Sequence, residues 1–172
     1  FKFESGRMGT LFANVDYDFD EGRINIDAVA QDEDGRHTDI NGYVSPKHNY
    51  IDLAIDAHRT RAEFMESFCG SFMDNVNADI NGNVNVVGPL NNINLVGKAV
   101  VDGSVRLSAL NTTYWMRGDS VTFVPDEIKF KGDTIYDRNG NIGIMTGSIY
   151  HKHLTNLSYA LKVKAKNLLA YD

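Results

Sequence analysis

The sequence is poor in cysteine, proline and tryptophan, which number one, three and one among its 172 residues. The lone cysteine, Cys69, has no partner for an internal disulfide, so cysteine usage does not indicate a cellular compartment. No apolar run reaches the roughly 18 residues that a membrane-spanning helix needs. The formal net charge of −6 argues against nucleic acid as a partner, because binding to phosphates requires a basic surface.

Length and composition are those of an ordinary globular protein. With 172 residues, of which 42% are hydrophobic and 23% charged, the chain can bury one sizeable core, and we expect a single domain over residues 1–172. It begins at Phe1 without a signal-like segment, so we expect a fragment of a longer protein whose membrane anchor lies outside it.

Residues 76 to 109 alternate between apolar and polar side chains almost without a break. One parity of residues 76–86 is mainly Val, Ile and Ala, and the other is Asn and Asp. Because successive strand side chains point to opposite faces, this predicts a strand with one apolar and one Asn/Asp face. A Gly-Pro-Leu-Asn-Asn turn at 88–92 follows, then two more strands, at 95–101 and 105–107.

The same alternation recurs on both sides of this segment. Residues 1–58 predict a meander of about four short strands. Further strands are expected at 111–115, 121–124, 128–132, 143–149 and 157–165. Turn signals separate the strands, at 20–23, 32–35, 45–49, 125–127 and 137–141. The fold class is therefore all-β, a mainly antiparallel meander of about ten to twelve strands.

One segment, residues 61–73, has helical rather than strand spacing. Thr60 and Glu63 fit a capping box, and large apolar residues follow at helical intervals. We expect a short amphipathic helix that either plugs an apolar opening or caps an ordinary core. The plug residues would be Phe64, Met65, Phe68 and Phe72.

The predicted helix is too small to cover the apolar face. A helix of about 12 residues is about 18 Å long, whereas strands about 4.8 Å apart make a sheet roughly 50 Å wide. We therefore expect the sheet to curl into an open or partly closed roll, aided by glycines on the apolar parity. The face would then enclose either a dry core or a groove for a ligand. Those glycines are Gly82, Gly97, Gly143 and Gly147.

The chain carries no recognisable catalytic motif, and we expect no enzyme, no cofactor and no metal site. Three aspartates mimic the start of a calcium loop, but Glu21 replaces its glycine and Asp27 its bidentate glutamate. His151 and His153 share a strand face without a third ligand, so we interpret them as structural or exposed. The three aspartates are Asp16, Asp18 and Asp20.

An ordered string of segments over residues 60–172 resembles the C-terminal domain of the TamB family of AsmA-like envelope proteins. Residues 1–58 match only as generic strands. The asparagine-rich face is similar to Bacteroidetes-type members. The segments are the helix at 64–73, INGNVNVVGP at 80–89, NLVGKAVVDGSVRL at 94–107, LNTTY at 110–114, DRNGN at 137–141, GSIYH at 147–151 and NLLA at 167–170.

The resemblance implies a taco-like curled sheet with an apolar concave face, in a periplasmic protein anchored in the inner membrane. Such proteins look like conduits for phospholipid between the inner and outer membranes, and some pair with a TamA- or BamA-like outer-membrane barrel. The groove-lining candidates that it implies are Ile80, Val84, Val86, Leu95, Val101, Val105, Leu107, Phe130, Met145, Ile149, Leu161 and Val163.

Three interpretations remain open from the sequence. The first is a lipid-binding or lipid-transfer segment. The second is a scaffold that assists outer-membrane protein assembly or secretion by pairing with a strand at an open sheet edge. The third, a carbohydrate-binding β domain, would need exposed aromatic platforms, for which Tyr114 and Trp115 are the candidates.

Overall fold

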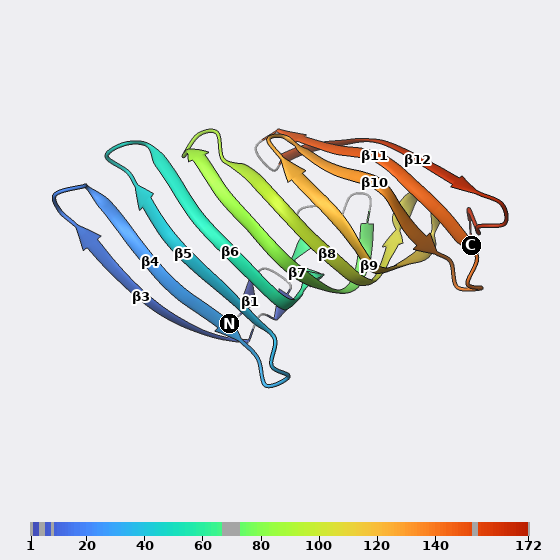
Figure 1. The fold of residues 1–172 in the computed structure, drawn as a ribbon, viewed down its shortest axis with the longest axis horizontal. Coiled ribbons are helices and arrows are strands. Elements are labelled where there is room, and N and C mark those ends of the chain that lie inside the picture. The colour runs from blue at the N-terminus through green and yellow to red at the C-terminus, as the bar shows by residue number, and fades with distance from the viewer. Residues whose placement is uncertain (1, 4–5, 8, 67–72, 153–154, 172) are drawn as a thin grey trace.

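The fold is one open sheet of ten antiparallel strands, in which the spatial order of the strands is their sequence order (Figure 1). The structure, a computed structural model, describes residues 2–3, 6–7, 9–66, 73–152 and 155–171. Two short strands at the N-terminus pair only with each other. In these ranges no helix combines the length and the apolar character that crossing a membrane requires.

The elements follow one another with short connections. The two-stranded sheet is β1 (Lys2–Phe3) and β2 (Gly6–Arg7). The ten-stranded sheet comprises β3 (Thr10–Asp18), β4 (Arg23–Gln31), β5 (His37–Ser45), β6 (Tyr50–Arg61), β7 (Met73–Pro89), β8 (Asn94–Leu107), β9 (Thr112–Val124), β10 (Glu127–Tyr136), β11 (Ile142–Lys152) and β12 (Thr155–Ala165). Two 3₁₀ turns, η1 (Ala62–Met65) and η2 (Ser108–Leu110), are the helical elements described in full.

Strand register places the apolar parity of every strand on one face. A single row of directly paired residues crosses all ten strands and carries no charged side chain, and we call it the apolar row. It consists of Ala13, Ala28, Ile40, Ile55, Val84, Gly97, Phe123, Ile128, Ile149 and Tyr159. The predicted antiparallel meander with one apolar and one Asn/Asp face is therefore confirmed.

The predicted curling is wrong, because the sheet neither closes nor curls strongly. Large side chains instead lie beside glycines of the neighbouring strands, which reduces their exposure without a second layer. Gly97 lies between Val84 and Phe123 in this way, and Gly147 between Phe130 and Leu161. Most of the apolar face is consequently half-buried rather than enclosed.

The densest packing lies in the C-terminal half of the sheet. Val121, Ile128 and Ile149 are buried there, and partly buried apolar side chains from β8 to β12 pack against them. Val101, Met116, Phe123, Phe130, Leu157 and Leu161 form that surrounding shell. This cluster supplies the core of an otherwise single-layered molecule.

The predicted turns between strands are confirmed, but two predicted breaks within strands are not. Segments 95–101 and 105–107 form one strand, β8, in which Gly103 pairs with both Ala78 and Met116. Segments 111–115 and 121–124 likewise join, from Thr112 onward, as β9, with a register shift opposite Val101 and Asp102. Bulges absorb the irregular residues and let each strand continue.

The predicted helix at 61–73 is also wrong at both ends. Arg61 still belongs to β6 and Met73 already belongs to β7. The hydroxyl of Thr60 does not cap a helix, because it lies 2.6 Å from the Thr38 hydroxyl inside the sheet. In the described part, β6 is followed by the turn η1 and by Glu66, which is helical. Residues 67–72, including Phe68 and Phe72, lie outside the described residues.

Candidate functional site

The apolar face is a candidate binding surface. Its side chains are most exposed toward the two sheet edges, where Val15 of β3 is 60% exposed and Tyr159 of β12 is 62% exposed. Toward the middle strands they are half-buried against one another. Only aliphatic, aromatic and glycine positions make up the apolar row, so the surface offers dispersion and hydrophobic contact with little polar selectivity.

The structure divides the twelve predicted groove residues into two groups. Val101, Phe130, Ile149 and Leu161 belong to the buried cluster or its shell, so they form core. The other eight lie outside that cluster. Seven of them are half-buried and Val163 is 44% exposed. The seven are Ile80, Val84, Val86, Leu95, Val105, Leu107 and Met145.

The predicted plug is only partly described. Met65 lies half-buried in η1, and η1 contacts β7 and β2 rather than the centre of the apolar face. The backbone of Phe64 lies in the same turn, whereas its side chain, like Phe68 and Phe72, is outside the described residues. In the described part, η1 does not cover the apolar row.

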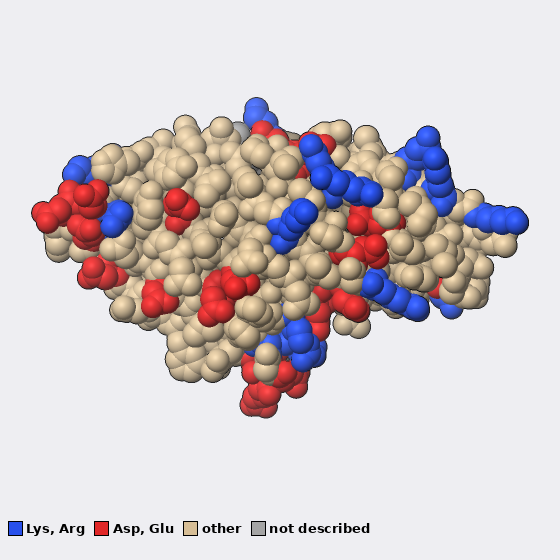
Figure 2. All heavy atoms as spheres, viewed as in Figure 1, with Lys and Arg blue, Asp and Glu red and all other residues tan. Residues whose placement is uncertain are grey.

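The opposite face is polar and divided by charge. Acidic side chains prevail toward the end of the sheet formed by the N-terminal strands and basic side chains toward the other end, and both kinds lie over the middle (Figure 2). The register gives the same gradient within one row of pairs, from Asp39 and Asp56 through Asn83 to Lys98 and Lys129. This face is suited to water, and the apolar face is the one that can take an apolar ligand.

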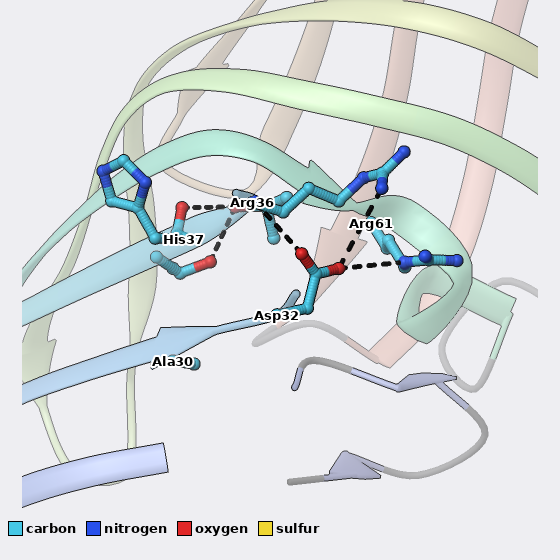
Figure 3. Close-up of a pocket in the computed structure, with 7 residues that line it drawn as sticks. Ala30, Asp32, Arg36, His37 and Arg61 are labelled. Carbon is cyan, nitrogen blue, oxygen red and sulfur yellow. Dashed lines mark hydrogen bonds and ion pairs between the residues drawn. The ribbon is translucent and has the colours of Figure 1, made fainter. Parts of the chain in front are cut away.

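Two arginines bind a group of carboxylates at the end of the β5–β6 hairpin. Arg36 donates to both oxygens of Asp79, at 3.1 and 3.3 Å, and to Asp34 at 2.8 Å. Arg61 donates to Asp34 at 3.2 Å, and Figure 3 shows Asp32 between the two guanidinium groups. The pocket between them has room for about one water molecule. These charges satisfy one another, so we assign the pocket a structural role.

The contacts in this network explain the pKa shifts of Arg36 and Asp32. The hydrogen bonds to Asp79 raise the pKa of Arg36 above its usual value, against a smaller opposing effect of desolvation. Burial alone would raise the pKa of Asp32, but amide donors from Arg36 and Asp34 and the two guanidinium groups lower it. Both groups therefore stay charged at neutral pH, as structural ion pairs do.

One serine and one histidine lie close enough to suggest a nucleophile, but the geometry assigns them to a turn. Ser45 Oγ is 3.0 Å from His48 Nδ1 and accepts from the His48 amide. The serine is 1% exposed and its hydroxyl donates to the carbonyl of Gly22 at 3.0 Å. A buried hydroxyl bound in this way cannot reach a substrate, so the pair anchors the β5–β6 turn.

The residues considered for metals have structural contacts of their own. Asp18 accepts from the amides of Asp20 and Glu21 and so closes the β3–β4 turn. His151 is buried and its amide donates to Asp126 at 3.0 Å, while His153 lies outside the described residues. A different group, which the sequence did not single out, has its ligand atoms within 4.8 Å of one another, namely His37, Asp39 and His58.

The two edges of the sheet differ in chemistry. Strand β3 presents Leu11, Phe12, Val15 and Tyr17 as exposed side chains and contains no lysine or arginine. Strand β12, at the other edge, carries exposed Lys162 and Lys164. Lysine on an edge strand discourages pairing with another chain, so β3 is the edge better suited to strand addition.

Comparison of the chain with known protein families, with curated proteins and with solved structures finds no match. The resemblance to the TamB family therefore stays a prediction that rests on its ordered sequence segments. What the geometry itself defines is an open antiparallel sheet with an apolar face that no other described element covers.

Proposed function

We propose that the chain is a non-enzymatic, lipid-binding segment of a periplasmic lipid-transfer protein of the TamB-like type. The protein would lie between the inner and outer membranes. Phospholipid acyl chains would bind to the apolar row and to the apolar side chains beside it. The observation that supports this is the apolar row itself, which crosses ten strands without a charged residue and has no covering layer among the described elements.

Leaving this apolar face in water costs free energy, and a lipid would relieve that cost. Each acyl methylene removed from water contributes about 0.8 kcal/mol, and the aliphatic wall gains as well. An open sheet covers one side of an acyl chain, so we expect several chains to lie side by side and shield one another. A surface without polar groups imposes little headgroup selectivity, which suits a conduit for mixed phospholipids.

Photocrosslinking tests where the lipid lies. The protein would be incubated with a phosphatidylethanolamine that carries a photoreactive group on its acyl chain, irradiated, digested and mapped by mass spectrometry. We expect adducts on apolar-parity residues such as Ile55 and Val84, and not on their polar-parity neighbours Asp56 and Asn83. Adducts spread equally over both faces would contradict the proposal.

A second candidate function is a scaffold that pairs with strands of outer-membrane barrel proteins. The observation that favours it is the β3 edge, whose exposed side chains are largely apolar and whose strand lacks lysine. Titration with an unfolded outer-membrane barrel protein would then slow amide hydrogen exchange in β3, and Val15→Lys would abolish the protection. Protection in the central strands with no change in β3 would instead favour binding to the apolar face.

A further inference from the structure

The β5–β6 hairpin brings two histidines and two aspartates together on the polar face of the sheet. His37 and His58 are directly paired across the strands, and Asp39 and Asp56 form the next pair on the same face. The imidazole centroids are 4.2 Å apart, with the rings inclined by 21°. His37 Nε2 lies 3.6 Å from Asp39 Oδ2, and His58 Nε2 lies 3.3 Å from Asp56 Oδ2.

We propose that His37, Asp39 and His58 bind a divalent transition-metal ion of the Zn²⁺ class, with Asp56 as a further ligand or as the hydrogen-bond partner of His58. The ligand atoms of the first three residues all lie within 4.8 Å of one another. Ligands at about 2.0–2.2 Å from a tetrahedral zinc are about 3.3 Å apart, so small side-chain rotations bring the three onto one ion.

Accessibility and charge favour binding at this place. The four side chains are between 39% and 48% exposed, which leaves room for an ion, a bound water and the required rotations. The residues paired with the cluster on the neighbouring strands are neutral: Gln31 of β4 lies opposite His37, and Asn83 of β7 lies opposite Asp56. Two carboxylates beside two imidazoles therefore make the site favourable for a cation.

The nearby arginines are engaged elsewhere. Arg59, next to His58 in the chain, has its Nε 3.6 Å from Asp79. Arg36 is held by Asp79 and Asp34, and Figure 3 shows the ring of His37 turned away from Asp32 and Arg36. The carboxylate beside each imidazole thus comes from its own strand, at 3.6 Å for His37 and 3.3 Å for His58, and no arginine among the described residues competes for it.

The donor set defines the class of ion. Imidazole nitrogen with carboxylate oxygen suits Zn²⁺, Co²⁺, Ni²⁺ or Cu²⁺, whereas Ca²⁺ and Mg²⁺ prefer an all-oxygen shell. A metal here would join β5 to β6 beside the bulge at Arg59, so it would stabilise the N-terminal half of the sheet. This inference is independent of the proposed lipid function, since the site lies on the opposite face.

Isothermal titration of tag-free protein with ZnCl₂ tests the site, with CaCl₂ as a second titrant. We expect one Zn²⁺ site that weakens about tenfold or more in His58→Gln and in Asp39→Asn, because removing even a supporting group of a metal site costs 10–100-fold. The matched controls His48→Gln and Asp52→Asn, in the same hairpin but outside the cluster, should bind like the wild type.

Three results would overturn the site. They are the absence of Zn²⁺ binding to the folded wild type, unchanged affinity in His58→Gln, and equal binding of Ca²⁺. Far-ultraviolet circular dichroism of each variant establishes that a lost site does not reflect lost folding. A rise in Tm of the wild type with Zn²⁺, absent from His58→Gln, would provide independent support.

Discussion

Asp137, in the turn between β10 and β11, accepts a hydrogen bond from the amide of Leu169 at 2.9 Å and so ties the C-terminal segment to the sheet. The same carboxylate accepts from the amides of Asn139 and Asn141 and from the Asn141 side chain. Burial alone would raise the pKa of Asp137, but these donors outweigh it and lower the pKa to about 2. Asp137 thus holds the C-terminal segment through hydrogen bonds that its charged carboxylate accepts.

These hydrogen bonds predict that the effect of Asp137→Asn on stability depends on pH. Since the folded pKa is depressed, the charged carboxylate contributes its full stability above its unfolded value of 3.8 and loses it as pH falls toward about 2. We expect a Tm several degrees below wild type at pH 7 and a much smaller difference near pH 2. Asp52→Asn is the exposed control, and a constant Tm difference across this range would contradict the assignment.

Tyr114 binds the same residue of the C-terminal segment. Its hydroxyl donates to the carbonyl of Leu169 at 2.7 Å, and the residue is 5% exposed. Tyr114→Phe should cost about 1 kcal/mol of unfolding free energy. In combination with Asp137→Asn the two costs should not add, because one variant already frees the segment that both residues hold. Fully additive costs in urea melts would show that the contacts act independently.

Gly97 allows close approach of β7 and β8. Its φ is +151°, and a Cβ at this position would lie 2.2 Å from the carbonyl oxygen of Asn83. Gly118 also has a positive φ, of +79°, but a Cβ there would meet nothing within 4 Å. Gly118→Ala should therefore lower the free energy of unfolding by about 1–2 kcal/mol, because only the backbone conformation is unfavourable for alanine. Gly97→Ala should cost clearly more, and equal costs would contradict the steric account.

The arginine network predicts a salt-dependent loss of stability. Arg36→Lys keeps the charge but cannot form the bidentate contact with Asp79, so its Tm should fall below wild type at low ionic strength. In 1 M NaCl, where the Debye length is about 3 Å, the difference should shrink, because partly exposed ion pairs are screened. Lys131→Arg, at an exposed position, is the control. A difference that salt leaves unchanged would point to packing rather than charge.

Much of the fold could be predicted from side-chain alternation and turn residues. The faces of β7 and β8 follow directly from the alternation that begins at Val76, and the hairpin at Asp137 from its Asn-Gly pair. Strand continuity was not predictable in this way. Asp102-Gly103 has the composition of a turn, but Gly103 fits a continuous strand because its neighbours on β7 and β9 approach closely.

The prediction of a curled sheet is wrong for a related reason. The sequence shows that glycines share a face with large apolar residues, but only the register shows that Val84 and Phe123 flank Gly97. That pairing reduces exposure within a single layer and removes the need for closure. The capping box at Thr60 failed because local spacing does not report the hydrogen bond between the Thr60 and Thr38 hydroxyls, and β6 continues to Arg61.

The histidine cluster could have been found from the hairpin alone. His37 precedes Ser45 by as many residues as His58 follows Tyr50, and Ser45 and Tyr50 are the pair that closes the β5–β6 turn. A regular antiparallel hairpin therefore places the two histidines opposite each other. The pattern His-x-Asp on one strand and Asp-x-His on the next was the available signal.

The most direct test of the account is mass spectrometry of phospholipid extracted from the purified domain. Three proteins would be compared: wild type, Val84→Asp with Leu95→Asp on the apolar face, and Val87→Asp with Val96→Asp on the polar face of the same strands. We predict stoichiometric phospholipid on the wild type and on the polar-face variant, and its loss from a folded apolar-face variant. Folded wild type without lipid, or lipid retained by the apolar-face variant, would contradict lipid binding by this face.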